Sequence, residues 1–191
     1  MNEERSPARE PLAARIFETV EYFAVAFCAV LLFFTFAARI CVVKGPSMDP
    51  TLADGQRLIV SDLFWEPQAG DVVVFHQTGT LNEAVVKRLI ALPGQTVELD
   101  FRTGTLRVDG SVVEESYAYL DGGAYWNTAE YNTRDGVFTL TVPDGCYFVM
   151  GDNRNHSTDS RSLAIGPVDA RRMLGRVVLR LTPFSAFGIV E

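Results

Sequence analysis

Two different patterns of hydrophobic and polar positions divide this chain of 191 residues. Residues 23–38 read FAVAFCAVLLFFTFAA, an apolar run that contains a single threonine as its only polar residue. With the apolar positions on its flanks, the run reaches the roughly 20 residues that a helix needs to cross a bilayer. We therefore expect a polar tail over residues 1–19 and a transmembrane helix over residues 20–40.

A cleaved secretory signal is the alternative interpretation of this segment, because residues 35–37 (TFA) form a small-x-small cleavage pattern. The long charged stretch before the run and the length of the run itself favour a retained anchor. Charge does not give the orientation, since each side carries two basic residues near the ends of the helix. These residues are Arg9 and Arg15 on one side, and Arg39 and Lys44 on the other.

After residue 43 the pattern changes to short apolar runs that are separated by Gly, Pro and Asp. The runs are rich in β-branched and aromatic residues and have the length of strands. Asp109-Gly110 and Asp144-Gly145 are turn pairs of the hairpin type. We therefore expect a mainly β fold, in which an antiparallel, barrel-like β-sheet domain spans residues 41–191 and residues 121–135 form a long loop without assignable chemistry. The predicted strands lie in residues 57–62, 71–76, 84–92, 96–101, 105–110, 137–142, 146–151 and 175–181.

Composition excludes several classes of function. The formal net charge is −7 and the sequence pI is about 4.9, which argues against a nucleic-acid partner, because phosphate binding needs clustered basic residues. The three cysteines have no regular spacing, so they indicate neither a disulfide framework nor a zinc site. We expect no metal and no cofactor.

One lysine stands out in a chain that otherwise uses arginine. There are 15 arginines and two lysines, Lys44 and Lys87. Lys87 lies in the run AVVKRLIAL, where alternation places it on the same strand face as Val85 and Leu89. Burial lowers the pKa of an amine, and a neutral amine can take a proton from a serine, which an arginine cannot do. An ordinary surface lysine is the alternative.

Two polar segments could complete such a site. In GPSMDPTL, residues 45–52, flanking prolines fix the backbone around Ser47, so that a hydroxyl and backbone N–H groups can be aimed at one point. The segment GDNRNHSTDSR, residues 151–161, follows a predicted strand and is almost entirely polar. It does not fit a calcium loop, because Arg154 stands at a ligand position. A solvent-exposed turn is the alternative for each segment, and neither His76 nor His156 has a local carboxylate that marks it as a base.

These segments, in their order along the chain, resemble the conserved boxes of bacterial type I signal peptidases, in a short form with one N-terminal span. The resemblance covers residues 36–175 and is most specific in the last box. Its residues are Ser47-Met48-x-Pro50-Thr51-Leu52, Gly70-Asp71-Val72-Val73, Val86-Lys87-Arg88 with Pro93-Gly94, and Gly151-Asp152-Asn153-Arg154-x-x-Ser157-x-Asp159-Ser160-Arg161.

The resemblance implies a membrane-bound serine endopeptidase that removes signal peptides from secreted preproteins and cuts after small residues in an Ala-x-Ala pattern. Ser47 would be the nucleophile, with its backbone N–H as an oxyanion donor, and Lys87 would be the general base. Ser157 would orient the Lys87 amine, and Asp159 and Arg161 would be a structural pair that supports the site. The resemblance also implies the orientation, with the tail of residues 1–19 in the cytoplasm. The β domain would lie outside the cytoplasm, against the bilayer and near the secretion translocon.

The chain departs from the longer Gram-negative pattern at Gly45, where those enzymes carry a serine whose hydroxyl helps to bind the oxyanion. The second oxyanion donor is therefore open, and we expect Gly45→Ser to keep or raise turnover. Two rival functions fit the sequence less well. Self-cleaving repressors share a Ser-Lys β fold but lack an N-terminal span, and a non-catalytic binding domain would not need both Ser47 and Lys87.

Overall fold

The computed structural model describes residues 11–36, 38–77, 83–123 and 133–190 and divides the chain into two compact units, residues 1–38 and 39–191. In the first unit, helix α1 spans Leu12–Phe36. Its segment Leu12–Phe33 has a mean hydropathy of 1.9, and it is long and apolar enough to cross a membrane.

The helix bounds differ from the expected span of residues 20–40. The helix begins earlier, directly after Pro11, because the residues that follow are good helix formers and a proline is tolerated at a helix start. It ends earlier because Arg39–Val42 form strand β1, which pairs with residues 57–60. The apolar residues Ile40 and Val42, which read as an extension of the span, are β-branched and belong to the sheet.

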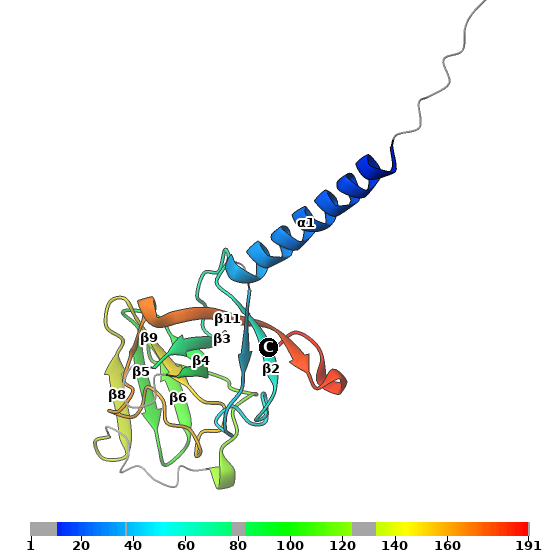
Figure 1. Cartoon of the computed structure of the whole chain (residues 1–191). Helices are drawn as coiled ribbons and strands as arrows, with labels where there is room; N and C mark the ends of the chain where they lie inside the picture. The colour runs from blue at the N-terminus through cyan, green and yellow to red at the C-terminus, as the bar shows by residue number, and fades with distance from the viewer. Residues whose placement is uncertain (1–10, 37, 78–82, 124–132, 191) are drawn as a thin grey trace, which may run out of the picture. The chain divides into compact units, whose positions relative to one another are not determined.

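The second unit contains a seven-stranded sheet in the order β1-β2-β11-β3-β4-β9-β10, in which every pair of neighbours is antiparallel (Figure 1). The expected antiparallel β fold is therefore confirmed. The strands of this sheet are β1 (Arg39–Val42), β2 (Arg57–Ser61), β3 (Val72–His76), β4 (Ala84–Ala91), β9 (Cys146–Met150), β10 (Val168–Asp169) and β11 (Met173–Thr182).

A smaller sheet has four strands in the order β7-β6-β5-β8. Short 3-10 helices η1 (Asp121–Gly123), η2 (Ala170–Arg172) and η3 (Phe184–Ala186) lie in the connections. Residues 124–132 of the expected loop lie outside the described residues. The strands are β5 (Thr96–Asp100), β6 (Thr105–Val108), β7 (Ser111–Val112) and β8 (Val137–Thr141).

The two predicted hairpin turns have different outcomes. Asp109-Gly110 joins the paired strands β6 and β7, with φ angles of 52° and 77°, as a type I′ hairpin turn requires. Asp144-Gly145 is not a hairpin, because it joins β8 in the smaller sheet to β9 in the larger one. A turn pair gives the local reversal of the chain, but it does not determine which strands then form hydrogen bonds.

The central strands β3 and β4 have apolar contacts on both faces. Val72, Val74 and Val86 belong to one buried cluster, whereas Val73 and Leu89 belong to another. A strand covered on both sides is apolar at consecutive positions rather than at alternate ones. This position explains the continuous run VVVF in β3, and it places the charged residues of β4 in the interior.

Candidate active site

The Ser47 loop connects β1 to β2 and is held by the loop that follows β9. The backbone N–H of Asn153 donates to the Ser47 carbonyl at 3.1 Å, and the Asn153 side chain donates to the Pro46 carbonyl at 3.1 Å. The next side chain, Met48, is 1% exposed and packs in the apolar cluster beside β3. Ser47 is therefore fixed on both sides, by hydrogen bonds from the second loop and by the burial of its neighbour.

Lys87 reaches Ser47 from the middle of β4. Its Nζ donates to the Ser47 Oγ at 2.6 Å and to the Val86 carbonyl at 3.0 Å. The whole lysine is only 3% exposed. The structure thus brings together the predicted nucleophile and the predicted base, which are 40 residues apart in the sequence.

The environment of Lys87 makes its amine unusually acidic. Burial lowers the pKa of Lys87 from 10.5 to about 8, because the charged form loses hydration. The negative charges of Asp159 and Asp152 act in the opposite direction, and the positive charge of Arg161 adds to the lowering. A substantial fraction of the amine is therefore neutral near physiological pH, so that it can accept a proton from the serine hydroxyl.

The predicted support residues form a buried cluster around one carboxylate. Asp159 accepts hydrogen bonds from the Ser157 hydroxyl at 2.7 Å and from the Gly151 backbone N–H at 2.9 Å. Arg161 donates to both oxygens of Asp159, at 2.7 and 2.8 Å. Burial alone would raise the pKa of Asp159, but the guanidinium and these hydrogen bonds outweigh it and hold the pKa below its ordinary value.

Gly151 connects this cluster to Ser47. A Cβ atom at position 151 would collide with the backbone carbonyl of Ser47 and with the side chain of Ser157. The two serines therefore lie on either side of a position that only glycine can occupy. The structure places Ser157 in the immediate surroundings of Ser47, while the role of Ser157 in orienting the Lys87 amine stays a prediction.

Two buried ion pairs were missed by the sequence reasoning. Arg88 donates to both oxygens of Asp152 at 2.9 and 2.8 Å, and Thr51 donates to the same carboxylate at 2.6 Å. Arg154 likewise donates to both oxygens of Glu115, at 2.7 and 2.6 Å. The first pair ties the Ser47 loop and the loop after β9 to β4. Both arginines lie within quoted motifs, but their partners are distant in the sequence.

Gly45 has a backbone conformation that the sequence alone did not reveal. Its φ angle is +78°, in the left-handed region that disfavours other residues, and its N–H donates to the Asp54 carboxylate at 2.7 Å. This geometry argues against the expectation that a serine is tolerated there. Within the described part of the chain, the Ser47 N–H has no hydrogen-bond acceptor, so it is available to a substrate oxygen.

A small cavity of about 70 Å³ lies beside Ser47 and Lys87. A cavity of about 150 Å³ accommodates benzene, so this one suits a side chain much smaller than an aromatic ring. One wall comes from the segment after β1 and the other from the beginning of β4. The lining residues are Val43, Lys44, Ser47, Met48, Glu83, Ala84, Val85, Val86 and Lys87.

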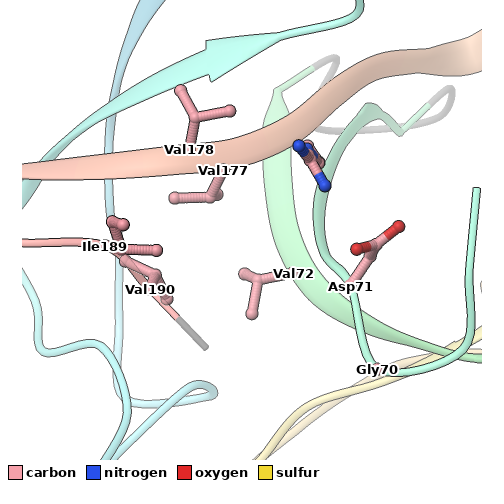
Figure 2. A pocket seen from close by; sticks show the side chains of 8 residues that line it. Gly70, Asp71, Val72, Val177, Val178, Ile189 and Val190 are labelled. Atoms are coloured by element: carbon pink, nitrogen blue, oxygen red, sulfur yellow. The ribbon is translucent and has the colours of Figure 1, made fainter. Parts of the chain in front are cut away.

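A second cavity, of about 270 Å³, lies between the start of β3, strand β11 and the C-terminal segment. Figure 2 shows the apolar side chains of Val72, Val177, Ile189 and Val190 around it. The nearby Asp71 carboxylate is engaged, since it accepts from the Trp65 indole at 2.8 Å. Neither Ser47 nor Lys87 lines this cavity, so it is separate from the paired serine and lysine.

Neither histidine lies in the buried cluster. His76 is exposed at the end of β3, and His156 is exposed in the loop after β9. Among the described residues, no group of three or more His, Cys, Asp or Glu side chains is arranged to hold a metal ion. The arrangement suited to chemistry is therefore the hydroxyl of Ser47 with the amine of Lys87, next to a small cavity.

Comparison with known proteins identifies the family to which the chain belongs. Residues 16–182 match the family described as signal peptidase, peptidase S26. The probable signal peptidase I-1 of Synechocystis sp. is 37% identical over 181 residues, which cover 90% of this chain and 85% of the relative. Signal peptidase IB of Staphylococcus aureus is 36% identical over 186 residues, which cover 90% of this chain and 92% of the relative.

Among solved structures, a crystal structure of a signal peptidase I from Enterococcus faecalis V583 is 34% identical, with a TM-score of 0.46. The match covers 59% of this chain and 97% of the other. The family match extends over most of the chain, including both the Ser47 loop and strand β4. This chain therefore belongs to the signal peptidase family, peptidase S26.

Proposed function

We propose that this protein is a serine endopeptidase that removes signal peptides from preproteins, with Ser47 as its nucleophile and Lys87 as its general base. Membership of the family and the names of its relatives support the activity. The observation that carries the assignment of residues is the 2.6 Å contact between the Lys87 amine and the Ser47 hydroxyl, made by a lysine that burial makes more acidic.

In the acylation step, the neutral Lys87 amine takes the proton of Ser47 as Oγ attacks the carbonyl carbon of the scissile peptide bond. The tetrahedral oxyanion accepts a hydrogen bond from the Ser47 backbone N–H. When the intermediate collapses, the C–N bond breaks and the Lys87 ammonium returns its proton to the leaving amine. The signal peptide then remains as an ester on Ser47, and the mature chain leaves.

In the deacylation step, water attacks the ester carbonyl while Lys87 takes one proton from the water. Breaking the ester bond returns that proton to Ser47 Oγ and releases the signal peptide with a free carboxylate. Asp159 and Arg161 hold the loop that contacts Ser47. Ser157 orients the Lys87 amine in both its neutral and its charged form. None of these steps uses a metal or a cofactor.

The preference for small residues before the cut follows from the size of the cavity. A volume of about 70 Å³ beside Ser47 accepts alanine side chains and excludes rings. The substrate enters as an extended strand, and pairs its backbone with the segments on either side of the cavity. Alanine at the first and third positions before the cut is therefore the preferred pattern.

The membrane arrangement forms part of the same proposal. The expected span of residues 20–40 lies mostly within α1, Leu12–Phe36, but its last two residues belong to β1, so we place the membrane span in α1. The tail before α1 would lie in the cytoplasm, and the β domain that begins at Arg39 would lie outside it as the catalytic domain. The 22-residue apolar segment of α1 supports an anchor in the lipid bilayer. An extracytoplasmic site near the secretion translocon would meet preproteins as they emerge. Protease added to wall-stripped cells should digest the β domain, and protection of that domain would reverse the orientation.

The function is tested with purified protein and a preprotein that carries an Ala-x-Ala site. Cleavage should occur directly after the second alanine, and it should stop when that residue is replaced with phenylalanine. Ser47→Ala should abolish cleavage while circular dichroism stays unchanged. Full activity of the Ser47→Ala variant would exclude Ser47 as the nucleophile, and equal cleavage of the phenylalanine substrate would exclude the proposed pocket.

A further inference from the structure

An ion pair joins the two walls of the cavity beside Ser47. The Nζ of Lys44 lies 3.0 Å from Oε1 of Glu83, across a sequence separation of 39 residues. Lys44 follows strand β1, and Glu83 directly precedes strand β4. Their side chains are 68% and 45% exposed, so the pair is at the surface of the unit.

The cavity is therefore bridged by two polar contacts. Lys87 and Ser47 form one of them, and Lys44 and Glu83 form the other. Glu83 precedes Lys87 by four residues, which corresponds to roughly 13 Å along an extended strand. Apolar side chains line the cavity as well, and these are Val43, Met48, Ala84, Val85 and Val86.

The Lys44–Glu83 ion pair contributes little to the stability of the fold. Exposed ion pairs contribute little to folding, since water screens the charges and two long side chains must be ordered. An ion pair that is easily broken can instead act on which side chains enter the cavity. A small substrate side chain can bind in the cavity while the Lys44–Glu83 ion pair stays formed. A bulkier substrate side chain must separate the two charges before it can bind.

We propose that the Lys44–Glu83 ion pair forms a specificity-determining part of the wall of the substrate cavity beside Ser47. This inference rests on the proposed function, because it assigns the cavity to the residues before the cut. An extended substrate with its scissile carbonyl at Ser47 advances about 3.3 Å per residue. Alternate side chains of an extended strand face the same way, so the third residue before the cut is the next after the first whose side chain faces this cavity. The ion pair in the cavity wall then disfavours branched side chains at that position.

The test compares substrates that differ only at the third position before the cut, with alanine in one and leucine in the other. The measured quantity is the ratio of kcat/KM for the leucine substrate to kcat/KM for the alanine substrate. Lys44→Ala and Glu83→Gln should each raise this ratio about threefold, the scale of losing one exposed ion pair. Lys44→Arg should keep the parental ratio, because arginine retains the charge.

A charge swap separates the ion pair from the individual side chains. The double variant Lys44→Glu with Glu83→Lys should return the ratio to the parental value. Arg171→Ala is the matched control, since it removes the cation of another exposed ion pair, with Asp169, that does not line this cavity. The control should leave the ratio unchanged.

Two results would overturn the inference. One is a ratio in both single variants equal to that of the parent and of the Arg171→Ala control. The other is a raised ratio that the charge swap fails to lower. Failure of the proposed function looks different, because the parent would then not cleave the alanine substrate or Ser47→Ala would still cleave it.

Discussion

Lys87 and Arg88 are neighbours on β4 that lie in the interior with different partners. Lys87 is 3% exposed and contacts Ser47, whereas Arg88 is 2% exposed and binds both oxygens of Asp152. Successive side chains of a strand point to opposite faces, so one position serves the chemistry and the next one fixes the loops. The two residue types match these tasks, because lysine can lose its proton and arginine keeps its charge.

Replacing Lys87 with arginine should abolish cleavage in a folded protein. Arginine retains the positive charge and much of the length, but it cannot accept the serine proton. We expect a loss of more than about 10²-fold in kcat/KM, the lower range of the gain from general base catalysis. The measurement is a cleavage assay with circular dichroism as the test of folding.

Lys44→Arg is the matched variant for that experiment. Lys44 is exposed and paired with Glu83, so arginine can keep the same contact, and cleavage should persist. If Lys87→Arg keeps activity within tenfold of the parent, Lys87 is not the base. Lys44 and the exposed histidines would then have to be reconsidered.

The rate should depend on the ionisation of Lys87. The pKa of about 8 means that the amine is mostly charged at pH 6 and mostly neutral at pH 9. Because the neutral form is the base, kcat/KM should rise nearly tenfold per pH unit below about 8 and level off above it. Lys44→Arg should show the same profile. A limb centred near 10.5, the ordinary lysine value, would show that the amine is not desolvated in the working enzyme.

The same pKa shift has a defined effect on stability. Below pH 8 Lys87 is charged in both states, so the folded protein bears the whole cost of the buried charge. Between about 8 and 10.5 the unfolded chain holds more protons, so the free energy of unfolding should rise with pH, by on the order of 3 kcal/mol at ~1.4 kcal/mol per unit. The difference between parent and Lys87→Met in chemical denaturation isolates this term, and a flat difference would contradict it.

Gly45→Ser should lower stability, contrary to the expectation from the resemblance. A side chain at φ +78° costs roughly 1–2 kcal/mol, although the space around a Cβ is open. We expect a lower Tm and a lower turnover. Gly45→Ala has the same strain without the hydroxyl, so faster cleavage by the serine variant than by the alanine variant would show that the hydroxyl binds the oxyanion. A parental Tm in both variants would show that the strain is absent.

Most of the sheet was predictable from local pattern. All eight predicted runs contain a strand, because β-branched residues between turn signals form strands in almost any context. Strand β1 was missed because its residues continue the apolar character of the preceding helix, and pairing with β2 determines their conformation. The hairpin at Asp144-Gly145 was wrong for a related reason, since strand pairing is decided by packing beyond the turn.

The catalytic residues of the site were predictable, because the chemistry of each depends on its own residue type and local sequence. A lysine in an apolar strand and a serine between prolines are visible in the sequence, and the structure brings them together. The pairs Arg88–Asp152 and Lys44–Glu83 were not visible, because 64 and 39 residues separate the partners and charged residues are common. The strain at Gly45 was hidden as well, since a backbone angle depends on the path of the whole loop.

Gly151→Ala tests the contact between the loop after β9 and the Ser47 loop. Here the backbone conformation is ordinary for any residue, and the obstacle is space, because the new methyl group would overlap the Ser47 carbonyl and the Ser157 side chain. Overpacking of this kind typically costs 1–3 kcal/mol. The overlap with backbone should also move Ser47 away from Lys87, and a misplacement of about 1 Å can lower a rate by ~10²-fold. We therefore expect a larger loss of kcat/KM in Gly151→Ala than in Gly45→Ala, measured with the same substrate on proteins whose folding has been checked by circular dichroism. Equal activity of the Gly151→Ala variant and the parent would show that the two loops are not in close contact in the working enzyme.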